Sequence, residues 1–244
     1  MFFKLELPKT SFVEREIEVL DFISSSVINR KFGVIYIPKE CSLHSEEILS
    51  STPSSTKYLN FIKKLGVCIR LKDYAGFNGG LDTSQDLDGK FTVSRNSETQ
   101  QIIFHVATMM PNIFSNDKFM VNNKKRHLGN DNVHIVFNES ETPYDPNTLS
   151  GEFNFVQIEI NPLGKSYYRI IVHKKEDLFF DGLFSFNQIV TKKSLIPMLL
   201  SIAINADNAS MSKMEKDGKI SGIGNYSNLA QRLLHIKKLK NLKK

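Results

Sequence analysis

The sequence predicts an α/β fold in which helices flank a central mixed β-sheet. Short apolar runs rich in β-forming residues recur along the chain, and helical patterns with start and stop signals lie between them. The chain has 244 residues, of which 41% are hydrophobic, so it can bury a substantial core. The sequence contains no internal repeat or low-complexity tract, and no clean boundary divides it. We therefore expect one domain over residues 1–244.

The first predicted elements are a strand, a helix and a second strand. Residues 32–37 (FGVIYI) form a short apolar run, which predicts a buried strand. A helix is predicted between Ser55 and its stop signal Gly66. Alternating apolar residues predict a strand over residues 67–71, and a long glycine-rich connection of the kind that is often functional or mobile follows over residues 74–90. The apolar face of the helix consists of Tyr58, Leu59, Ile62 and Leu65.

A second helix is predicted over residues 97–110. Ser97 and Gln100 have the spacing of a capping box, and a proline follows the segment. Within it, His105 is interpreted as a packed or partly exposed histidine rather than a metal ligand. The apolar stripe of this helix consists of Ile102, Ile103, Val106, Ala107 and Met110.

The second half of the chain adds strands and then two helices. Strands are predicted over residues 133–137, 156–160 and 167–172, the last two paired as a hairpin across a turn at residues 162–165. The helix that follows Ser194 and the final helix have apolar faces formed by Leu199, Ile202, Ala203, Ala206 and Ala209 and by Leu229, Leu233, Ile236 and Leu239, respectively.

Charge and composition limit the class of protein. The net charge is +6 with a pI near 9.1, and residues 235–244 carry the longest concentration of basic residues. A partner with an acidic face fits this charge, as do nucleic acid or anionic lipid, and a solvated helix face is the simplest interpretation of the basic end. Two cysteines do not predict a disulfide framework. No apolar run reaches the ~18 residues of a membrane span, so we expect a cytoplasmic protein.

Several familiar enzyme chemistries lack their sequence signatures. Gly164, Lys165 and Ser166 resemble the end of a phosphate-binding P-loop, but Glu159 occupies the position of the required glycine. The six histidines are scattered, and the sequence contains no HExxH, paired CxxC or GxSxG motif. We expect no metal site, no bound cofactor and no independent hydrolase activity.

Residues 124–137 (KKRHLGNDNVHIVF) are the most informative stretch. Three cations and a histidine precede a turn at Gly129, and Asn130 then stands close before a β-branched run. A carboxamide has an acceptor and a donor, so it can hold a water molecule from two sides. Asparagine beside glycine is equally typical of a turn or cap residue, so the residues themselves leave both interpretations open.

Five segments together carry a resemblance to a known family. They resemble the Rap/Ral/tuberin GTPase-activating protein family (RapGAP domain), and they occur in that family's order over nearly the whole chain. The resemblance implies a G-domain-like catalytic fold that acts on a Ras-subfamily small GTPase. The segments are FNGGLDTS (77–84), QIIFHVATMMP (101–111), KKRHLGNDNVHIVFNE (124–139), GEFNFVQIEINPL (151–163) and INADNAS (204–210).

The resemblance implies an asparagine-thumb mechanism in place of an arginine finger. Asn130 is the residue that matches the thumb, which positions the water that attacks GTP. His127 is implied as a contact or support residue for the thumb, with a cap or packing role as the alternative.

The remaining site residues follow from the same resemblance. Lys124, Lys125 and Arg126 are expected to meet the acidic switch surface of the GTPase, or to be an ordinary solvated charge run. Arg232 matches a further basic position. Gly129 and Asp131 are interpreted as conformational, the glycine by allowing the turn and the aspartate by holding it through local hydrogen bonds.

The implied partner is a Ras-subfamily GTPase that carries GTP and Mg²⁺ itself. We expect no nucleic-acid partner, and proximity to a membrane only through the GTPase. Different segments resemble the Rap, tuberin and Ral branches, so Rap, Rheb and Ral remain open as partners, and the oligomeric state is not determined. Two alternatives also remain: an adaptor that binds a GTPase without accelerating hydrolysis, and a basic phosphate- or lipid-binding module.

Overall fold

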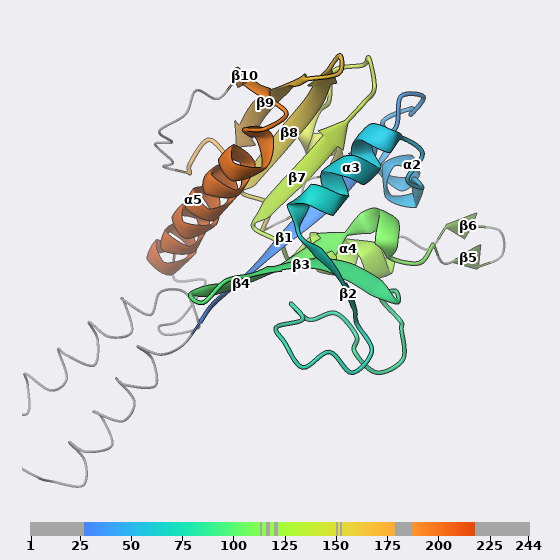
Figure 1. Ribbon diagram of the computed structural model, residues 1–244, viewed down its shortest axis with the longest axis vertical. Helices are drawn as coiled ribbons and strands as arrows, with labels where there is room; N and C mark the ends of the chain where they lie inside the picture. The colour runs from blue at the N-terminus through green and yellow to red at the C-terminus, as the bar shows by residue number, and fades with distance from the viewer. Residues whose placement is uncertain are drawn as a thin grey trace, which may run out of the picture.

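The central strand β1 (Ile28–Ile37) organises the fold of this protein, which is known from a computed structural model (Figure 1). β1 lies between β4 (Gln100–Val106) and β7 (Val133–Asn138) and is parallel to both. β7 in turn is parallel to β8 (Val156–Leu163). The residues that the structure describes are 27–112, 114–115, 118–119, 122–149, 151, 153–178 and 187–217.

Antiparallel strands extend the parallel centre on both sides. β9 (Tyr167–Lys174) and β10 (Asn187–Thr191) follow β8, whereas β3 (Phe91–Asn96) and β2 (Val67–Arg70) follow β4. The described residues thus form an eight-stranded sheet in the order β10-β9-β8-β7-β1-β4-β3-β2. This mixed sheet confirms the predicted fold class. Two further strands, β5 (Phe114–Ser115) and β6 (Lys118–Phe119), pair with each other.

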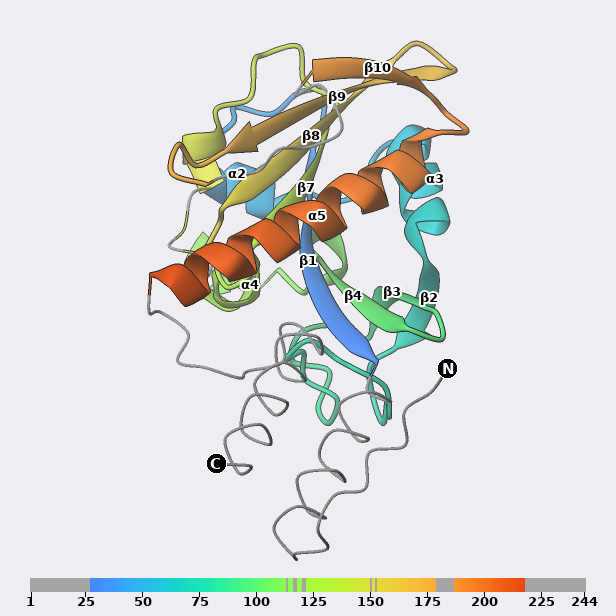
Figure 2. The ribbon, with the colours of Figure 1, turned by 90° about the vertical axis from the view of Figure 1, so that its left-hand side faces the viewer.

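Helices cover both faces of the sheet (Figure 2). The helices α3 (Thr56–Leu65) and α5 (Leu195–Lys216) pack on one face, and α2 (Ser45–Ser50) and α4 (Asn122–Leu128) pack on the other. Because β1 is buried on both sides, it reads as a continuous apolar run rather than an alternating one. Two short 3₁₀ helices, η1 (Ala107–Met109) and η2 (Pro146–Leu149), complete the described elements.

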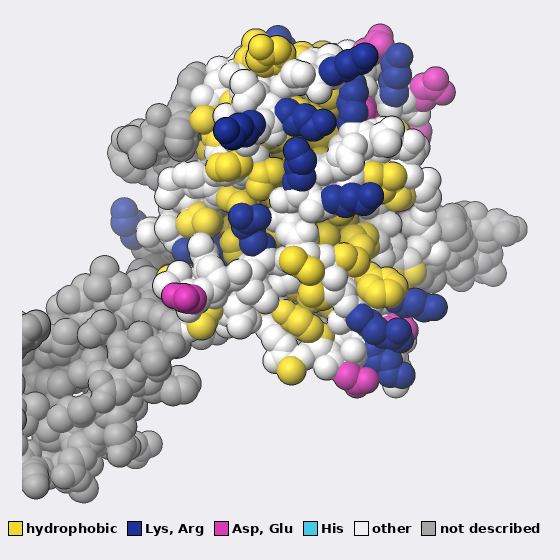
Figure 3. Space-filling view, viewed as in Figure 1, with side chains coloured by type: hydrophobic (Ala, Val, Ile, Leu, Met, Phe, Trp, Pro, Cys, Tyr) yellow, Lys and Arg dark blue, Asp and Glu magenta, His cyan; other side chains and the backbone are white. Residues whose placement is uncertain are grey.

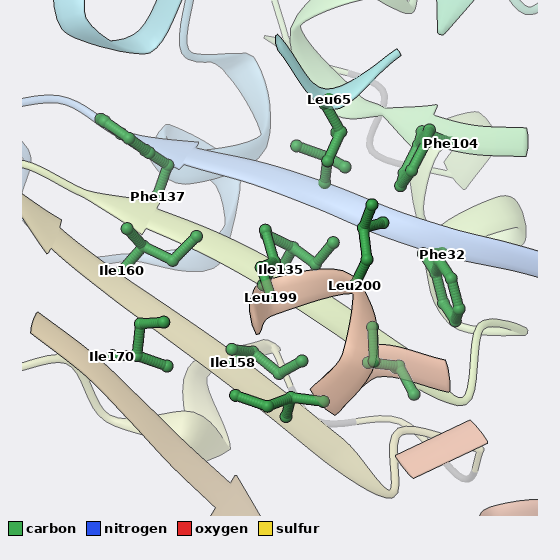
Figure 4. Close-up of a cluster of buried hydrophobic side chains, with 14 of the residues drawn as sticks. Phe32, Leu65, Phe104, Ile135, Phe137, Ile158, Ile160, Ile170, Leu199 and Leu200 are labelled. Carbon is green, nitrogen blue, oxygen red and sulfur yellow. The ribbon is translucent and has the colours of Figure 1, made fainter. Parts of the chain in front are cut away.

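The larger core lies between the sheet and the helices α3 and α5 (Figure 4). Phe32, Phe104 and Phe137 point from three neighbouring strands into this layer, and Leu199 and Leu200 of α5 meet them. The opposite layer is more polar, because alternate residues of the same strands include His105 and His134. The candidate site is built on this second face.

The prediction of α3 is confirmed, but its buried face differs. Ser55 caps the helix, since its Oγ accepts a hydrogen bond of 3.0 Å from Tyr58 N. Leu59 is 43% exposed, and Phe61 takes its place in the core. The buried positions therefore follow the i, i+3, i+7 spacing of Tyr58, Phe61 and Leu65.

The helix predicted over residues 97–110 is wrong. Residues 100–106 form β4, and only residues 107–109 turn into η1. Ser97 does accept a 3.2 Å hydrogen bond from Gln100 N, but this bond closes the turn between β3 and β4 rather than capping a helix. β4 is covered on both faces, so its unbroken apolar run imitates a helical stripe.

The predicted strands at residues 133–137, 156–160 and 167–172 are confirmed, as is the helix after Ser194. Gly164 lies at φ +65° in the β8–β9 turn, as expected for a hairpin rather than a P-loop. The predicted final helix over residues 229–239 lies outside the described residues.

The distribution of charge on the surface and the apolar length of the helices also bear on the fold class. Lys and Arg side chains are spread over the face that carries α3, with Asp and Glu mainly at its margins (Figure 3). Within the described part of the chain, no helix is long and apolar enough to cross a membrane.

Candidate functional site

The segment singled out in the sequence forms the short helix α4 and the turn that follows it. Leu128, the last residue of α4, is buried against β1. The approach is close because Gly33 has no side chain: a Cβ there would lie 3.0 Å from Leu128 Cδ2 and 2.6 Å from His134 Cδ2. His134 Nε2 lies 2.7 Å from the Leu128 carbonyl oxygen, so that nitrogen carries the proton that it donates. The end of α4 is thereby fixed on the sheet.

Asn130 is exposed just beyond this end of the helix. Its backbone N–H donates to His127 O at 3.1 Å, and its side-chain Nδ2 donates to Arg126 O at 2.7 Å. Because one N–H of the amide is anchored, the orientation of the whole carboxamide is set. No described residue hydrogen-bonds to Oδ1, which keeps its lone pairs for solvent. The side chain that the sequence marked is therefore accessible and oriented.

Gly129 is needed in this turn for space rather than for a left-handed backbone, since its φ is not positive. Its N–H donates to Lys125 O at 2.7 Å, and an added Cβ would lie only 2.6 Å from the same oxygen. The conformational interpretation of Gly129 thus has a steric cause.

Asp131 holds the turn through distant partners, not through the local hydrogen bonds that the sequence suggested. Its side chain is fully buried, and Oδ2 lies 2.8 Å from Nδ1 of His105 in β4. Lys31 Nζ in β1 lies 3.6 Å from Oδ1. Asp131 therefore ties the turn to two strands of the sheet. His105, as predicted, is a packed histidine.

His127 is only 6% exposed, and its backbone carbonyl accepts the hydrogen bond from Asn130 N. Its Nε2 lies 2.9 Å from Asp88 Oδ1 and 3.1 Å from Arg126 Nη2. A guanidinium only donates, so the ring nitrogen accepts from Arg126 in one tautomer and donates toward Asp88 in the other. Burial lowers the pKa of His127, and the neighbouring Asp88 carboxylate partly opposes that shift.

The three cations of the segment have different environments. Lys124 is only 1% exposed, and its Nζ donates to Leu49 O at 2.7 Å and to Asn112 Oδ1 at 2.6 Å. The prediction that Lys124 meets the surface of a partner is therefore wrong, because its ammonium ties α4 to α2 inside the protein. Burial lowers its pKa to about 8. Lys125 and Arg126 remain at the surface, although Arg126 Nη2 also contacts Asp88 at 3.3 Å.

Two cavities flank Asn130. One, of 470 Å³, lies over α4 and η2, and the other, of 450 Å³, lies by the start of β1 and the end of α5. Asn130 and Phe153 line both, so the exposed amide stands on a ridge between two hollows.

The structure adds residues whose contact with the α4 turn the sequence did not indicate. Asp88, His105 and Lys31 all hold the α4 turn, yet they come from a loop and two other strands. An acidic residue at the end of the glycine-rich connection was the available signal for Asp88. The predicted site residue Arg232 lies outside the described residues.

Comparisons with known proteins agree on one family. A family model described as Rap/ran-GAP matches residues 48–238. The "Tuberous sclerosis 2 protein homolog" of Schizosaccharomyces pombe is 35% identical over 204 residues, which is 80% of this chain and 15% of that protein. The human "Ral GTPase-activating protein subunit alpha-1" is 35% identical over 179 residues, which is 73% of this chain and 8% of that protein.

A solved structure extends the similarity to three dimensions. The structure described as the "TSC2 GAP domain" superimposes with a TM-score of 0.67 at 32% identity, covering 77% of this chain and 99% of that one. The chain thus matches nearly all of that solved domain, but it spans less than a fifth of the full-length relatives named above.

Proposed function

Because the chain belongs to the Rap/Ran-GAP family of activators of small GTPases, we propose that it stimulates GTP hydrolysis by inserting Asn130 into the nucleotide site of its partner. The observation that carries this proposal is the exposed Asn130 amide, anchored through Nδ2 and presented on a ridge between two cavities. Asn130 is then the catalytic residue, and His127 is a positioning residue behind it.

The chemistry follows from the anchored amide. With Nδ2 held by Arg126 O, the Asn130 Oδ1 accepts a hydrogen bond from the attacking water and aims it at the γ-phosphate. Activators of GTPases contribute about 10³ to 10⁵ in rate, or about 4 to 7 kcal/mol of transition-state stabilisation. Orientation of one water supplies part of this, and exclusion of bulk solvent with ordering of the partner's switch segments supplies the rest.

The surroundings of Asn130 fit a protein partner with an acidic surface. Lys125 and Arg126 lie at the surface beside it and can steer the approach of the GTPase. The partner carries GTP and Mg²⁺, and this chain holds no cofactor and hydrolyses no nucleotide by itself. Rap, Rheb and Ral proteins are the candidate partners, and we place the encounter in the cytoplasm.

Single-turnover GTP hydrolysis tests the proposal. The wild type, Asn130→Ala and Asn205→Ala are each mixed with purified Rap, Rheb and Ral proteins loaded with GTP. Asn205 is an exposed amide on α5, on the opposite face of the sheet, and serves as the matched control. We expect Asn130→Ala to reduce hydrolysis to the intrinsic rate of the GTPase while its affinity for the partner changes by less than about twofold.

The outcomes separate the alternatives. Equal stimulation by the wild type and Asn130→Ala would eliminate the thumb. Binding of a GTPase without any stimulation would identify an adaptor.

A further inference from the structure

The connection between β2 and β3 is organised around a buried carboxylate. Asp88 is only 3% exposed and accepts a 2.8 Å hydrogen bond from Asp82 N through Oδ2. Asp82 in turn accepts hydrogen bonds from the backbone of Ser84, Gln85 and Leu87, which fixes the loop ahead of Asp88.

The loop is also fixed to the sheet, so Asp88 occupies a defined place. Gly89 follows it at φ +108°, and a Cβ there would lie 2.5 Å from Met109 O of η1. Leu71 and Leu81 of the same connection are buried with Ile103 of β4. The loop thus rests on β4 and η1 by close backbone and apolar contacts.

Asp88 faces the last turn of α4. Its Oδ1 lies 2.9 Å from His127 Nε2, and its two oxygens lie 3.3 and 3.5 Å from Arg126 Nη2. A carboxylate that meets two side chains of one helical turn restrains the rotation of that turn.

The same two residues hold Asn130 through their backbone. Arg126 O accepts from Asn130 Nδ2, and His127 O accepts from Asn130 N. Asp88 therefore contacts the side chains of the two residues whose backbone carbonyl groups orient the Asn130 amide. We call this arrangement of Asp88, Arg126 and His127 the clamp. A small displacement of either unit would move the Asn130 Oδ1.

We propose that Asp88 is a positioning residue for Asn130, acting through Arg126 and His127 from a loop distant in sequence. This inference deepens the proposed function and rests on it for its kinetic test. Asp88 lies behind the turn and is buried, so it acts without touching the nucleotide.

The test compares Asp88→Asn with Asp73→Asn, which removes the same charge from an exposed position of the same connection. Stimulated single-turnover hydrolysis is measured against the GTPase that responds to the wild type. We expect Asp88→Asn to lower kcat about tenfold or more with KM within about twofold, because misplacement of a catalytic group weakens the transition state more than binding. Asp73→Asn should match the wild type. Unchanged kcat in Asp88→Asn would overturn the proposal.

A second measurement needs no GTPase. The side-chain amide signals of Asn130 in ¹⁵N NMR spectra report its hydrogen bond to Arg126. We expect them to move toward the positions of an unbound amide in Asp88→Asn and to stay in place in Asp73→Asn. Unchanged signals in a folded Asp88→Asn protein would contradict the clamp.

These two measurements keep the two proposals apart. If the wild type stimulates no GTPase, the proposed function fails. The NMR comparison then decides by itself whether Asp88 positions the Asn130 amide. If Asp88→Asn does not fold, His127→Leu approaches the same contact from α4, and the same loss of kcat is expected. Full kcat in that variant would overturn the clamp.

Discussion

Adjacent lysines in α4 have different environments, since one is buried and the other is exposed. The same substitution is therefore expected to lower stability at the first and the association rate at the second. Lys124→Met leaves Leu49 O and Asn112 Oδ1 without their donor inside the protein. Unsatisfied buried acceptors cost about 1–3 kcal/mol, which lowers the melting temperature of a chain of this size by about 2–12 °C. Differential scanning calorimetry measures this change.

Lys125→Met is the matched variant, because its side chain is exposed. We expect its melting temperature to stay within about 1 °C of the wild type, since surface substitutions change stability little. Its association rate with the GTPase should fall at low salt and approach that of the wild type at high salt. A thermally neutral Lys124→Met would contradict the buried role of that ammonium.

The sequence predicts Asn130 and His127 as site residues, but it could not show what holds them. A motif names residues within one segment, whereas Asp88, His105 and Lys31 reach the turn from other elements. Their partners depend on how β1, β4 and the glycine-rich connection are placed beside α4. The burial of Lys124 was missed for the same reason, since a run of cations is usually solvated.

At the scale of elements, the end of α4 depends on the absence of a side chain at Gly129. Gly129→Ala would bring a Cβ to 2.6 Å from Lys125 O, so the last turn must open. We expect stimulated hydrolysis to fall on the order of 100-fold, because the Asn130 amide is displaced. Single-turnover kinetics measures this loss.

Gly151→Ala is a control in the same place. A Cβ at Gly151 would lie 3.5 Å from Gly129 O, which is ordinary van der Waals contact. This variant should retain activity within about twofold of the wild type, because the added methyl group meets its neighbours only at ordinary contact distance. Equal losses of stimulated hydrolysis in Gly129→Ala and Gly151→Ala would show that added bulk near the turn, rather than a change in the turn itself, lowers the activity.

Periodicity predicted some elements well and others poorly. The strands at β1, β7, β8 and β9 have β-branched runs bounded by turn residues, and all were recognised. β4 was taken for a helix because a strand buried on both faces loses its alternation. α4 was read only as a basic turn, since it is one short helix whose stability comes from packing on β1 rather than from its own sequence.

At the scale of the molecule, buried histidines predict how stability depends on pH. Burial lowers the pKa of His127 and of His134, partly opposed by Asp88 and Asp131, respectively. The unfolded chain therefore binds protons at a pH where the folded protein does not. The stabilisation is fully present above the unfolded value of about 6.5 and is lost as the pH falls toward the lower folded values.

We expect the melting temperature to decrease from pH 6.5 to pH 5. His134→Gln keeps a donor for Leu128 O but cannot titrate, so its stability should depend less on pH over the same range. Thermal unfolding followed by circular dichroism measures both. A melting temperature of the wild type that does not change from pH 6.5 to pH 5 would contradict the conclusion that the buried histidines are neutral in the folded protein.

The parallel centre of the sheet also has a consequence for synthesis. β1 leaves the ribosome before both of its neighbours, because β4 and β7 come from much later in the chain. Until β7 emerges, this apolar strand keeps unpaired edges that can associate with other nascent chains. Expression with chaperones, and at low temperature, should therefore raise the yield of native protein, and the Asn130 turn can assemble only after that pairing is complete.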